Sequence, residues 1–255
     1  MPQHAPVVAR LRAAGCVFAE DEARLLVAAA GSPAELEALV ARRVSGVPLE
    51  YLLGWAEFAG LRLVVAEGVF VPRRRTELLV AEALALLAGV ARPVVVDLCC
   101  GCGAIGAAIA ASRGETEIHA VDADPVAVGC ARRNLPAGQV YQGDLDAPLP
   151  GSLLGSADVV LANAPYVPTA AIDLMPREAR LYERPMALDG GADGLDVQRR
   201  VVAAAPRWLV PGGHLLVETS EPQAAELARA FARGGFEARV VRETDGLAVV
   251  GTLRS

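Results

Sequence analysis

Four consecutive residues, Asn163-Ala164-Pro165-Tyr166, have the types and order needed to hold a planar nitrogen. An amide or aromatic amine has a delocalised lone pair, so methyl transfer requires both N–H bonds to be held and the lone pair to be aimed. The Asn163 side-chain oxygen and the Ala164 carbonyl can accept these two hydrogen bonds, and Tyr166 can cover the flat face. Such acceptors stabilise the charge that develops on nitrogen, so no strong general base is required. The motif predicts an acceptor site with Asn163, Pro165 and Tyr166 as catalytic residues, although Asn-x-Pro after a strand is also a common turn signal.

A second segment, Asp97 to Gly106, has the composition of a cofactor-binding loop. Small residues after a strand let a ligand approach the backbone, and the following helix offers unpaired N–H groups. Roughly twenty residues later a second strand ends at Asp122, where a carboxylate can bind both hydroxyls of a ribose. Asp144 ends the third strand and could accept a hydrogen bond from an adenine amine or cap the next turn. The residues expected to bind a nucleoside-containing cofactor are Asp97, Cys99, Cys100, Gly101, Cys102, Gly103, Asp122, Asp144 and Asn163.

The stretch from Gly101 to Gly106 also fits G-x-G-x-x-G, which many dinucleotide-binding proteins share. Against that interpretation, Asp97 precedes the first glycine, where it could bind a cofactor amino group or fix the loop. The fourth strand also runs directly into Asn163 and Tyr166 at the carboxyl edge, where ligands of open α/β sheets bind. NAD-dependent oxidoreduction is therefore the weaker alternative.

Composition excludes several classes of protein. All 24 basic side chains are arginine, which removes P-loop NTPases and pyridoxal-phosphate enzymes because both require a lysine. The net charge of −6 disfavours broad attraction to nucleic acid. The five cysteines are an odd number and three of them lie in one loop, which disfavours a disulfide framework. No second Cys/His pair accompanies them, which disfavours a metal site.

The apolar stretches are too short for a membrane span, which needs roughly 20 residues. The N-terminal residues lack the sustained apolar core of a secretory signal. We therefore expect a cytoplasmic protein without membrane association.

The elements that must position these residues begin with a helical segment over roughly the first fifty residues. Ser32 can cap one helix, Glu35 can complete a capping box, and Gly46 can end that helix. A short helix is expected from Pro48. Alternating apolar and polar residues around Ala59-Gly60 then predict a β-hairpin linker within residues 55–71, and helix resumes at Thr76.

From residue 92 onward, short apolar strands alternate with helices, which predicts an α/β fold with a mostly parallel sheet covered on both faces. Too few residues separate the last two strands for a crossover helix, so they should form an antiparallel hairpin. The expected strands are PVVVDL, EIHAVD, QVYQGD, ADVVLAN, GHLLVET, FEARVV and LAVVGTL.

Nearly the whole chain resembles the HemK/PrmC protein-(glutamine-N5) methyltransferases. The resemblance is carried by RRVSGVPLEYLLGWAEFAGLRLVV, VFVPRRRTELLVAEAL, the cofactor loop, Asn163-Ala164-Pro165-Tyr166, YERPMALDGGADGLDVQRRVV and PGGHLLVET. The linker and ALDGGADGLD are rather specific to this family, whereas many methyltransferases share the cofactor loop.

The resemblance implies a class I, Rossmann-like methyltransferase domain with a seven-stranded sheet, and S-adenosylmethionine as cofactor with S-adenosylhomocysteine as product. It implies methylation of a glutamine side-chain amide in a protein, such as a peptide-chain release factor. Asp122 would bind ribose, Asp144 and Leu145 would border adenine, and residues 163–166 would hold the glutamine. The implied domains are a helical substrate-recognition domain over 1–54, a hairpin linker over 55–75 and a methyltransferase domain over 76–255.

Three departures from the family pattern stand out. Ala164 replaces the first proline of N-P-P-Y, which keeps the carbonyl but loses the fixed φ. Cys99 replaces the first loop glycine and would need a suitable local φ. The family's P-R-P-E-T-E reads PRRRTE here, so that Arg73, Arg74 and Arg75 either contact an acidic partner or form a solvated run. The departures keep two alternatives open: an adenine-N6 methyltransferase acting on nucleic acid, and a cofactor-binding regulatory relative without turnover.

Overall fold

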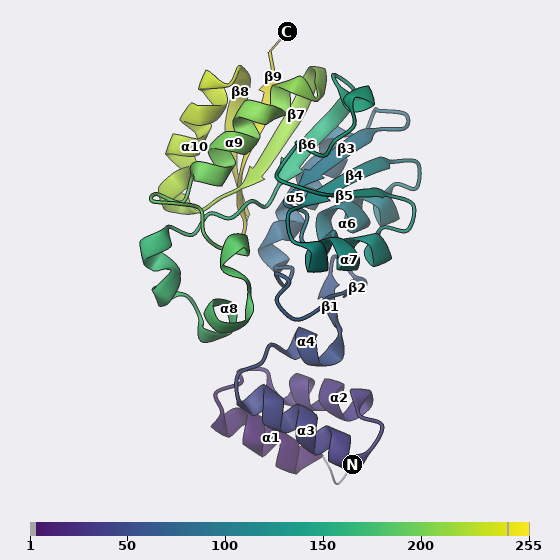
Figure 1. Ribbon diagram of the computed structural model, residues 1–255, viewed down its shortest axis with the longest axis vertical. Helices are drawn as coiled ribbons and strands as arrows, with labels where there is room; N and C mark the ends of the chain where they lie inside the picture. The colour runs from purple at the N-terminus through teal and green to yellow at the C-terminus, as the bar shows by residue number, and fades with distance from the viewer. Residues whose placement is uncertain (1–3, 244, 255) are drawn as a thin grey trace.

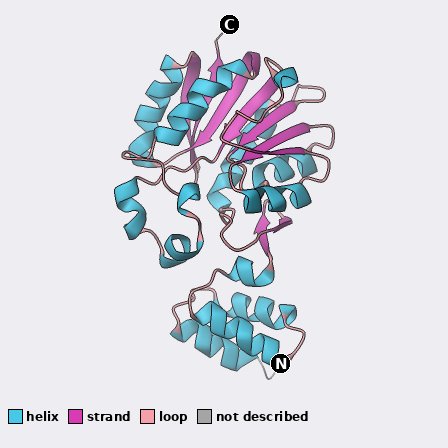
Figure 2. Cartoon of the chain, viewed as in Figure 1, coloured by secondary structure: helices cyan, strands magenta, loops and turns pink. Residues whose placement is uncertain are grey.

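A computed structural model describes residues 4–243 and 245–254. Four helices come first and lie at one end of the molecule (Figure 1). A two-stranded hairpin follows, and then a larger α/β unit in which helices cover a twisted sheet (Figure 2).

The N-terminal helices form around the capping signals that the sequence carries. Ser32 accepts a hydrogen bond from the Glu35 N–H at 3.2 Å, and the Glu35 carboxylate accepts one from the Gly31 N–H at 2.8 Å. Gly46 follows the end of the third helix with φ +104°. A separate apolar core, including Leu11 and Leu26, lies between the first three helices. The helices are α1 (His4–Ala13), α2 (Ala19–Ala29), α3 (Pro33–Val44) and α4 (Leu49–Leu53).

The predicted hairpin is present but shorter than the alternating pattern. Strands β1 (Trp55–Phe58) and β2 (Leu61–Val64) pair antiparallel across Ala59 and Gly60. Both turn residues have positive φ, which matches the right-handed twist of a two-residue hairpin. After β2 the chain continues without regular structure and reaches a 3₁₀ turn, η1 (Arg74–Thr76), and helix α5 (Glu77–Leu86).

The main sheet has seven strands in the order β5-β4-β3-β6-β7-β9-β8, and β9 runs in the direction opposite to the other six. Its fold class and its antiparallel C-terminal hairpin are as predicted. The strands are β3 (Val94–Leu98), β4 (Glu117–Asp122), β5 (Gln139–Gln142), β6 (Ala157–Ala162), β7 (Leu209–Glu218), β8 (Phe236–Arg242) and β9 (Leu247–Leu253).

Helices cover both faces of this sheet, and alternate strand residues enter the two cores. Val95 packs in the core beneath α5, α6 and α7, whereas Val96 packs in the core beneath α9 and α10. These helices are α6 (Ala104–Ser112), α7 (Pro125–Asn134), α9 (Asp196–Ala204) and α10 (Glu221–Arg233). The strand order reverses between β3 and β6, and ligands of open α/β sheets bind at such a reversal.

One irregular segment between β6 and α9 was not predicted from the sequence. It contains η3 (Thr169–Leu174), α8 (Arg177–Tyr182) and η4 (Pro185–Ala187). Figure 1 shows α8 below the sheet on the side of the N-terminal helices. An ion pair between Arg43 of α3 and Glu178 of α8 joins the two parts. The remaining 3₁₀ turns are η2 (Gly151–Leu153) and η5 (Ala205–Arg207).

Candidate active site

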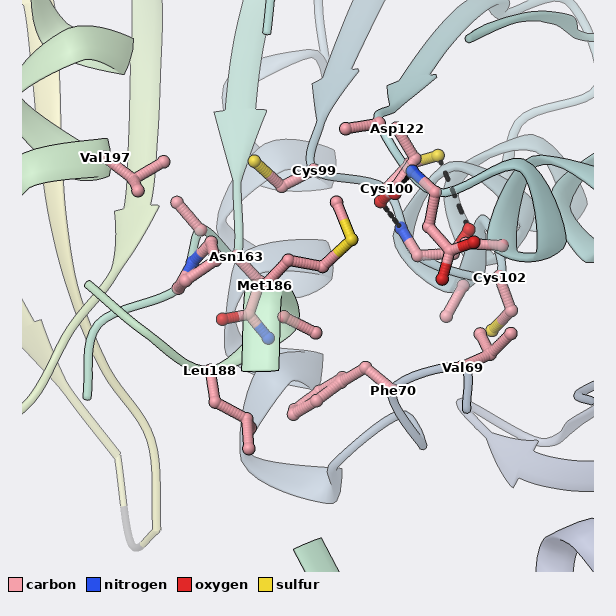
Figure 3. A pocket seen from close by; sticks show the side chains of 18 of the residues that line it. Val69, Phe70, Cys99, Cys100, Cys102, Asp122, Asn163, Met186, Leu188 and Val197 are labelled. Atoms are coloured by element: carbon pink, nitrogen blue, oxygen red, sulfur yellow. Dashed lines mark hydrogen bonds between the residues drawn. The ribbon is translucent and has the colours of Figure 1, made fainter. Parts of the chain in front are cut away.

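A cavity of about 280 Å³ opens at the carboxyl ends of β3, β4, β5 and β6. Figure 3 shows Cys99, Asp122 and Asn163 around it, with Phe70 from the segment after the hairpin and Met186 from η4. All the residues expected to bind cofactor or acceptor line this cavity except Asp97 and Gly103. The sequence-derived site is therefore brought together from four strand ends.

The loop after β3 is held in a left-handed conformation at three positions. Cys99, Gly101 and Gly103 have φ values of 55°, 57° and 78°. Cys99 therefore does not have a φ that suits a residue with a side chain, because the left-handed region favours glycine. At Gly103 a Cβ atom would lie 3.0 Å from Leu135 and 3.2 Å from the Cβ of Ala131, so close helix packing also requires glycine there.

Asp97 lies beneath this loop and not in the cavity lining. It is fully buried, and its Oδ2 accepts a hydrogen bond from the Gly106 N–H at 3.1 Å. Its Oδ1 has no hydrogen-bond partner within the described part of the chain. Burial raises the pKa of Asp97 to about 7, the bond from Gly106 opposes this rise, and the charge of Asp122 adds to it. This position favours a role in fixing the loop.

Asp122 faces the cavity from the end of β4. Its Oδ2 accepts the Gly101 N–H and its Oδ1 accepts the Asp124 N–H, both at 2.8 Å. Burial raises its pKa. Each carboxylate oxygen has a second lone pair, so Asp122 can still accept hydrogen bonds from two hydroxyl groups of a ligand.

Asp144 meets a partner that sequence reasoning missed. Its Oδ2 lies 2.7 Å from an Arg200 nitrogen of α9, and Arg200 also lines the cavity. The next residue, Leu145, is buried with φ 48° and borders the same space. No local pattern links these positions, because Arg200 reaches Asp144 only through the packing of α9 on the sheet.

The four residues of the acceptor motif lie at the end of β6. The Asn163 Nδ2 donates to the Thr76 hydroxyl at 3.3 Å, and Ala164 is almost fully buried. The Tyr166 hydroxyl donates to Oε1 of Glu218 at 3.1 Å, and the Tyr166 carbonyl accepts from Gln223 at 2.8 Å. Burial raises the pKa of Tyr166 to about 12, and the Glu218 charge adds to the rise, so the phenol stays neutral.

The three arginines at positions 73–75 do not form a single solvated surface. Arg73 pairs with the buried Glu183, and the Nε of Arg75 lies 3.1 Å from the buried Glu218. Arg74 is exposed, and within the described residues it has no ion-pair partner. Two of the three arginines therefore neutralise acids of this chain, which neither sequence interpretation anticipated.

The Asp189-Gly190-Gly191 segment lies outside the cavity lining. A Cβ at Gly190 would lie 2.6 Å from the Gly194 carbonyl oxygen, and one at Gly191 would lie 1.9 Å from an Asp196 oxygen. The glycines therefore allow a tight turn, so this segment is a loop that packs against residues 194–196.

The five cysteines are free thiols, and burial raises the pKa of the three loop thiols Cys99, Cys100 and Cys102. No group of three or more His, Cys, Asp or Glu side chains is arranged to hold a metal ion in residues 4–243 and 245–254. Over the same ranges, no helix combines the length and apolar character that crossing a bilayer requires.

The strand order, the small-residue loop after β3 and the carboxylate at the end of β4 define a class I methyltransferase. Residues 61–179 match the model of the Methyltransferase small domain family. The release factor glutamine methyltransferase of Geobacter sulfurreducens is 40% identical over 80% of this chain and 73% of its own length. That of Bifidobacterium longum is 35% identical over 93% of this chain and 87% of its own length. The chain belongs to the release factor glutamine methyltransferase family.

Solved structures agree with this fold. A Thermus thermophilus 16S rRNA N2 G1207 methyltransferase, solved with AdoMet and guanosine, superposes with a TM-score of 0.54 at 20% identity. The match covers 78% of this chain and 50% of that protein. A ribosomal protein L11 methylase from Lactobacillus delbrueckii gives 0.51 at 13% identity, covering 72% and 81%.

Proposed function

We propose that this protein transfers a methyl group from S-adenosylmethionine to the side-chain amide nitrogen of a glutamine in a release factor. The observation that carries the proposal is the shared cavity of Asn163 and Asp122, which joins an acceptor clamp to a carboxylate suited to ribose. The family to which the chain belongs supports the same activity.

The residues present fit a cationic nucleoside cofactor. Asp122 has no ion-pair partner in the described ranges and retains lone pairs toward the cavity. The left-handed backbone at Cys99 and Gly101 lets a ligand lie close to the loop. Asp122 would hold the ribose, Asp144 and Leu145 would border the base, and the loop would contact the remaining part. S-adenosylmethionine supplies an electrophilic methyl group on a sulfonium.

The acceptor clamp is chemically suited to a primary amide. The Asn163 Oδ1 and the Ala164 carbonyl accept hydrogen bonds from the two N–H groups of the glutamine nitrogen. Tyr166 covers the amide plane. The new N–C bond would form as the methyl–sulfur bond of the cofactor breaks, and the two acceptors would stabilise the positive charge that develops on that nitrogen. The methylated nitrogen would then lose one proton, which requires no strong base because an amide protonated on nitrogen is strongly acidic.

We assign recognition of the protein acceptor to residues 1–54, with 55–75 as linker and 76–255 as methyltransferase domain. Support for this division comes from the separate core of the first three helices. The exposed side chains of Leu174, Leu181 and Met186 extend from the cavity mouth along the η3-to-η4 segment and offer apolar contact to an incoming loop.

The test is methyl transfer from labelled S-adenosylmethionine to a purified release factor, followed by mass spectrometry of every glutamine-containing peptide. We expect one glutamine to gain the mass of a methylene group. Asn163→Ala should lower transfer by about 100-fold or more, as for loss of an oxyanion-hole donor, while cofactor affinity measured by calorimetry stays within about threefold. Label that enters RNA or DNA instead would favour the adenine alternative. Cofactor binding without transfer to any macromolecule would favour a regulatory relative.

A further inference from the structure

Two consecutive residues of the η1 turn, Arg75 and Thr76, contact both polar side chains of the acceptor motif. Thr76 bonds to Asn163, and Arg75 reaches Tyr166 through Glu218. We propose that Arg75 and Thr76 are positioning residues for the acceptor site. The inference rests on the proposed function, because it concerns how the clamp presents itself to a glutamine amide.

Thr76 anchors the Asn163 carboxamide at the edge of the cavity. Thr76 is 4% exposed, and its Oγ1 accepts a hydrogen bond from the Asn163 Nδ2. A carboxamide has a donor end and an acceptor end of nearly the same shape, and the glutamine nitrogen brings two N–H donors. If Asn163 were flipped, its NH₂ would meet the substrate NH₂ and no bond would form. In the observed orientation the Thr76 hydroxyl accepts from the NH₂ group, and the Asn163 Oδ1 is left to accept from the substrate.

Arg75 holds Tyr166 through a shared carboxylate. The Glu218 Oε1 accepts from both the Arg75 Nε and the Tyr166 hydroxyl, each at 3.1 Å. The Glu218 side chain is 2% exposed, and a buried carboxylate is stable only with a counter-charge or a proton. The Arg75 guanidinium supplies that charge and also lies 5.9 Å from the centre of the Tyr166 ring. A glutamate at position 75 would instead repel Glu218.

Neither Arg75 nor Thr76 makes a side-chain hydrogen bond to the cofactor loop. Substitutions at these two positions should therefore change methyl transfer without changing cofactor binding. Thr76 and Arg75 hold the clamp, whereas Asp122 holds the loop through Gly101. Loss of positioning should therefore lower kcat with the release factor and leave the affinity for S-adenosylmethionine unchanged.

The experiment measures kcat, the KM for the release factor and the Kd for S-adenosylmethionine in full-length variants. Thr76→Val keeps the shape and removes the hydroxyl, and should lower kcat about tenfold, the effect of one neutral hydrogen bond. Thr76→Ser restores the hydroxyl and should return kcat to within about threefold of wild type. Arg75→Met combined with Glu218→Gln avoids an unpaired buried charge and should lower kcat by about tenfold, with a cofactor Kd within about twofold of wild type.

The control is Arg74→Ala, a change on the same turn that should leave all three constants unchanged. A kcat for Thr76→Val equal to that of wild type overturns the role of Thr76, as does an equal loss in Thr76→Ser. A parallel rise in the cofactor Kd assigns both residues a merely structural role. If wild type transfers nothing to glutamine, the proposed function and this inference fail together, whereas transfer that survives every variant overturns the positioning roles alone.

Discussion

The buried carboxyl group of Asp97 gives the protein a defined pH dependence of stability. Its pKa is about 7 in the folded state, because burial disfavours the charged form. In the unfolded chain the same group has a pKa of about 4. Between these values the folded state keeps a proton that the unfolded state has released. The stabilisation from this proton is complete below about pH 4 and is lost as the pH rises through about 7.

Between about pH 5 and about pH 8 this loss amounts to about 2.5 kcal/mol, because roughly two pKa units of the window are crossed at about 1.4 kcal/mol each. Asp97→Asn removes the titration and keeps an oxygen that can accept the Gly106 N–H. Its new NH₂ group takes the place of Oδ1, which has no partner among the described atoms. That unsatisfied donor costs about 1 to 3 kcal/mol, and the cost is the same at every pH.

The assay is urea denaturation of wild type and Asp97→Asn at several pH values. The free energy of unfolding of wild type minus that of the variant should fall by about 2.5 kcal/mol from about pH 5 to about pH 8. Asp173→Asn is the control, because the Asp173 side chain is 91% exposed and should show no such trend. A wild-type-minus-variant difference that is constant with pH would refute the reasoning and would mean that Asp97 stays ionised throughout this range.

Three further changes follow from other parts of the structure. Asp122→Asn removes a charged acceptor from the proposed ribose site and should weaken S-adenosylmethionine binding by about 10- to 100-fold in calorimetry; a change below about threefold would contradict that role. Cys99→Gly relieves a left-handed conformation and should stabilise the protein by about 1 kcal/mol in thermal unfolding, whereas Cys99→Ala, which keeps a Cβ, should not. Arg43→Met leaves the carboxylate of Glu22 buried and unpaired and should destabilise the protein by about 3 kcal/mol or more in urea. Adding Glu22→Gln should recover much of that loss, and equal stability of the single and double variants would contradict the account.

Elements with strong local signals could be predicted from the sequence. Gly60 favours a two-residue turn because glycine adopts positive φ without a steric cost, and Ser32 favours a helix start because its side-chain oxygen accepts the Glu35 N–H. The segment with η3, α8 and η4 carries no period of two or 3.6, so no pattern indicated it. Its conformation depends on tertiary contacts, including the ion pair between Glu178 and Arg43.

The chemistry of the site was accessible from local motifs, but the orientation of its groups was not. Asn163 and Tyr166 follow a strand in the order that methylation of a planar nitrogen needs, so the motif predicts which groups would hold the acceptor. The carboxamide of Asn163 can nevertheless face the cavity with either end, and the Tyr166 ring is free to rotate unless its hydroxyl is held. Thr76 and Glu218, which hydrogen-bond to these two side chains, lie 87 and 52 residues away in the chain. A chain that carries the motif without such partners should bind the same acceptor in fewer productive orientations, and its defect should appear in kcat.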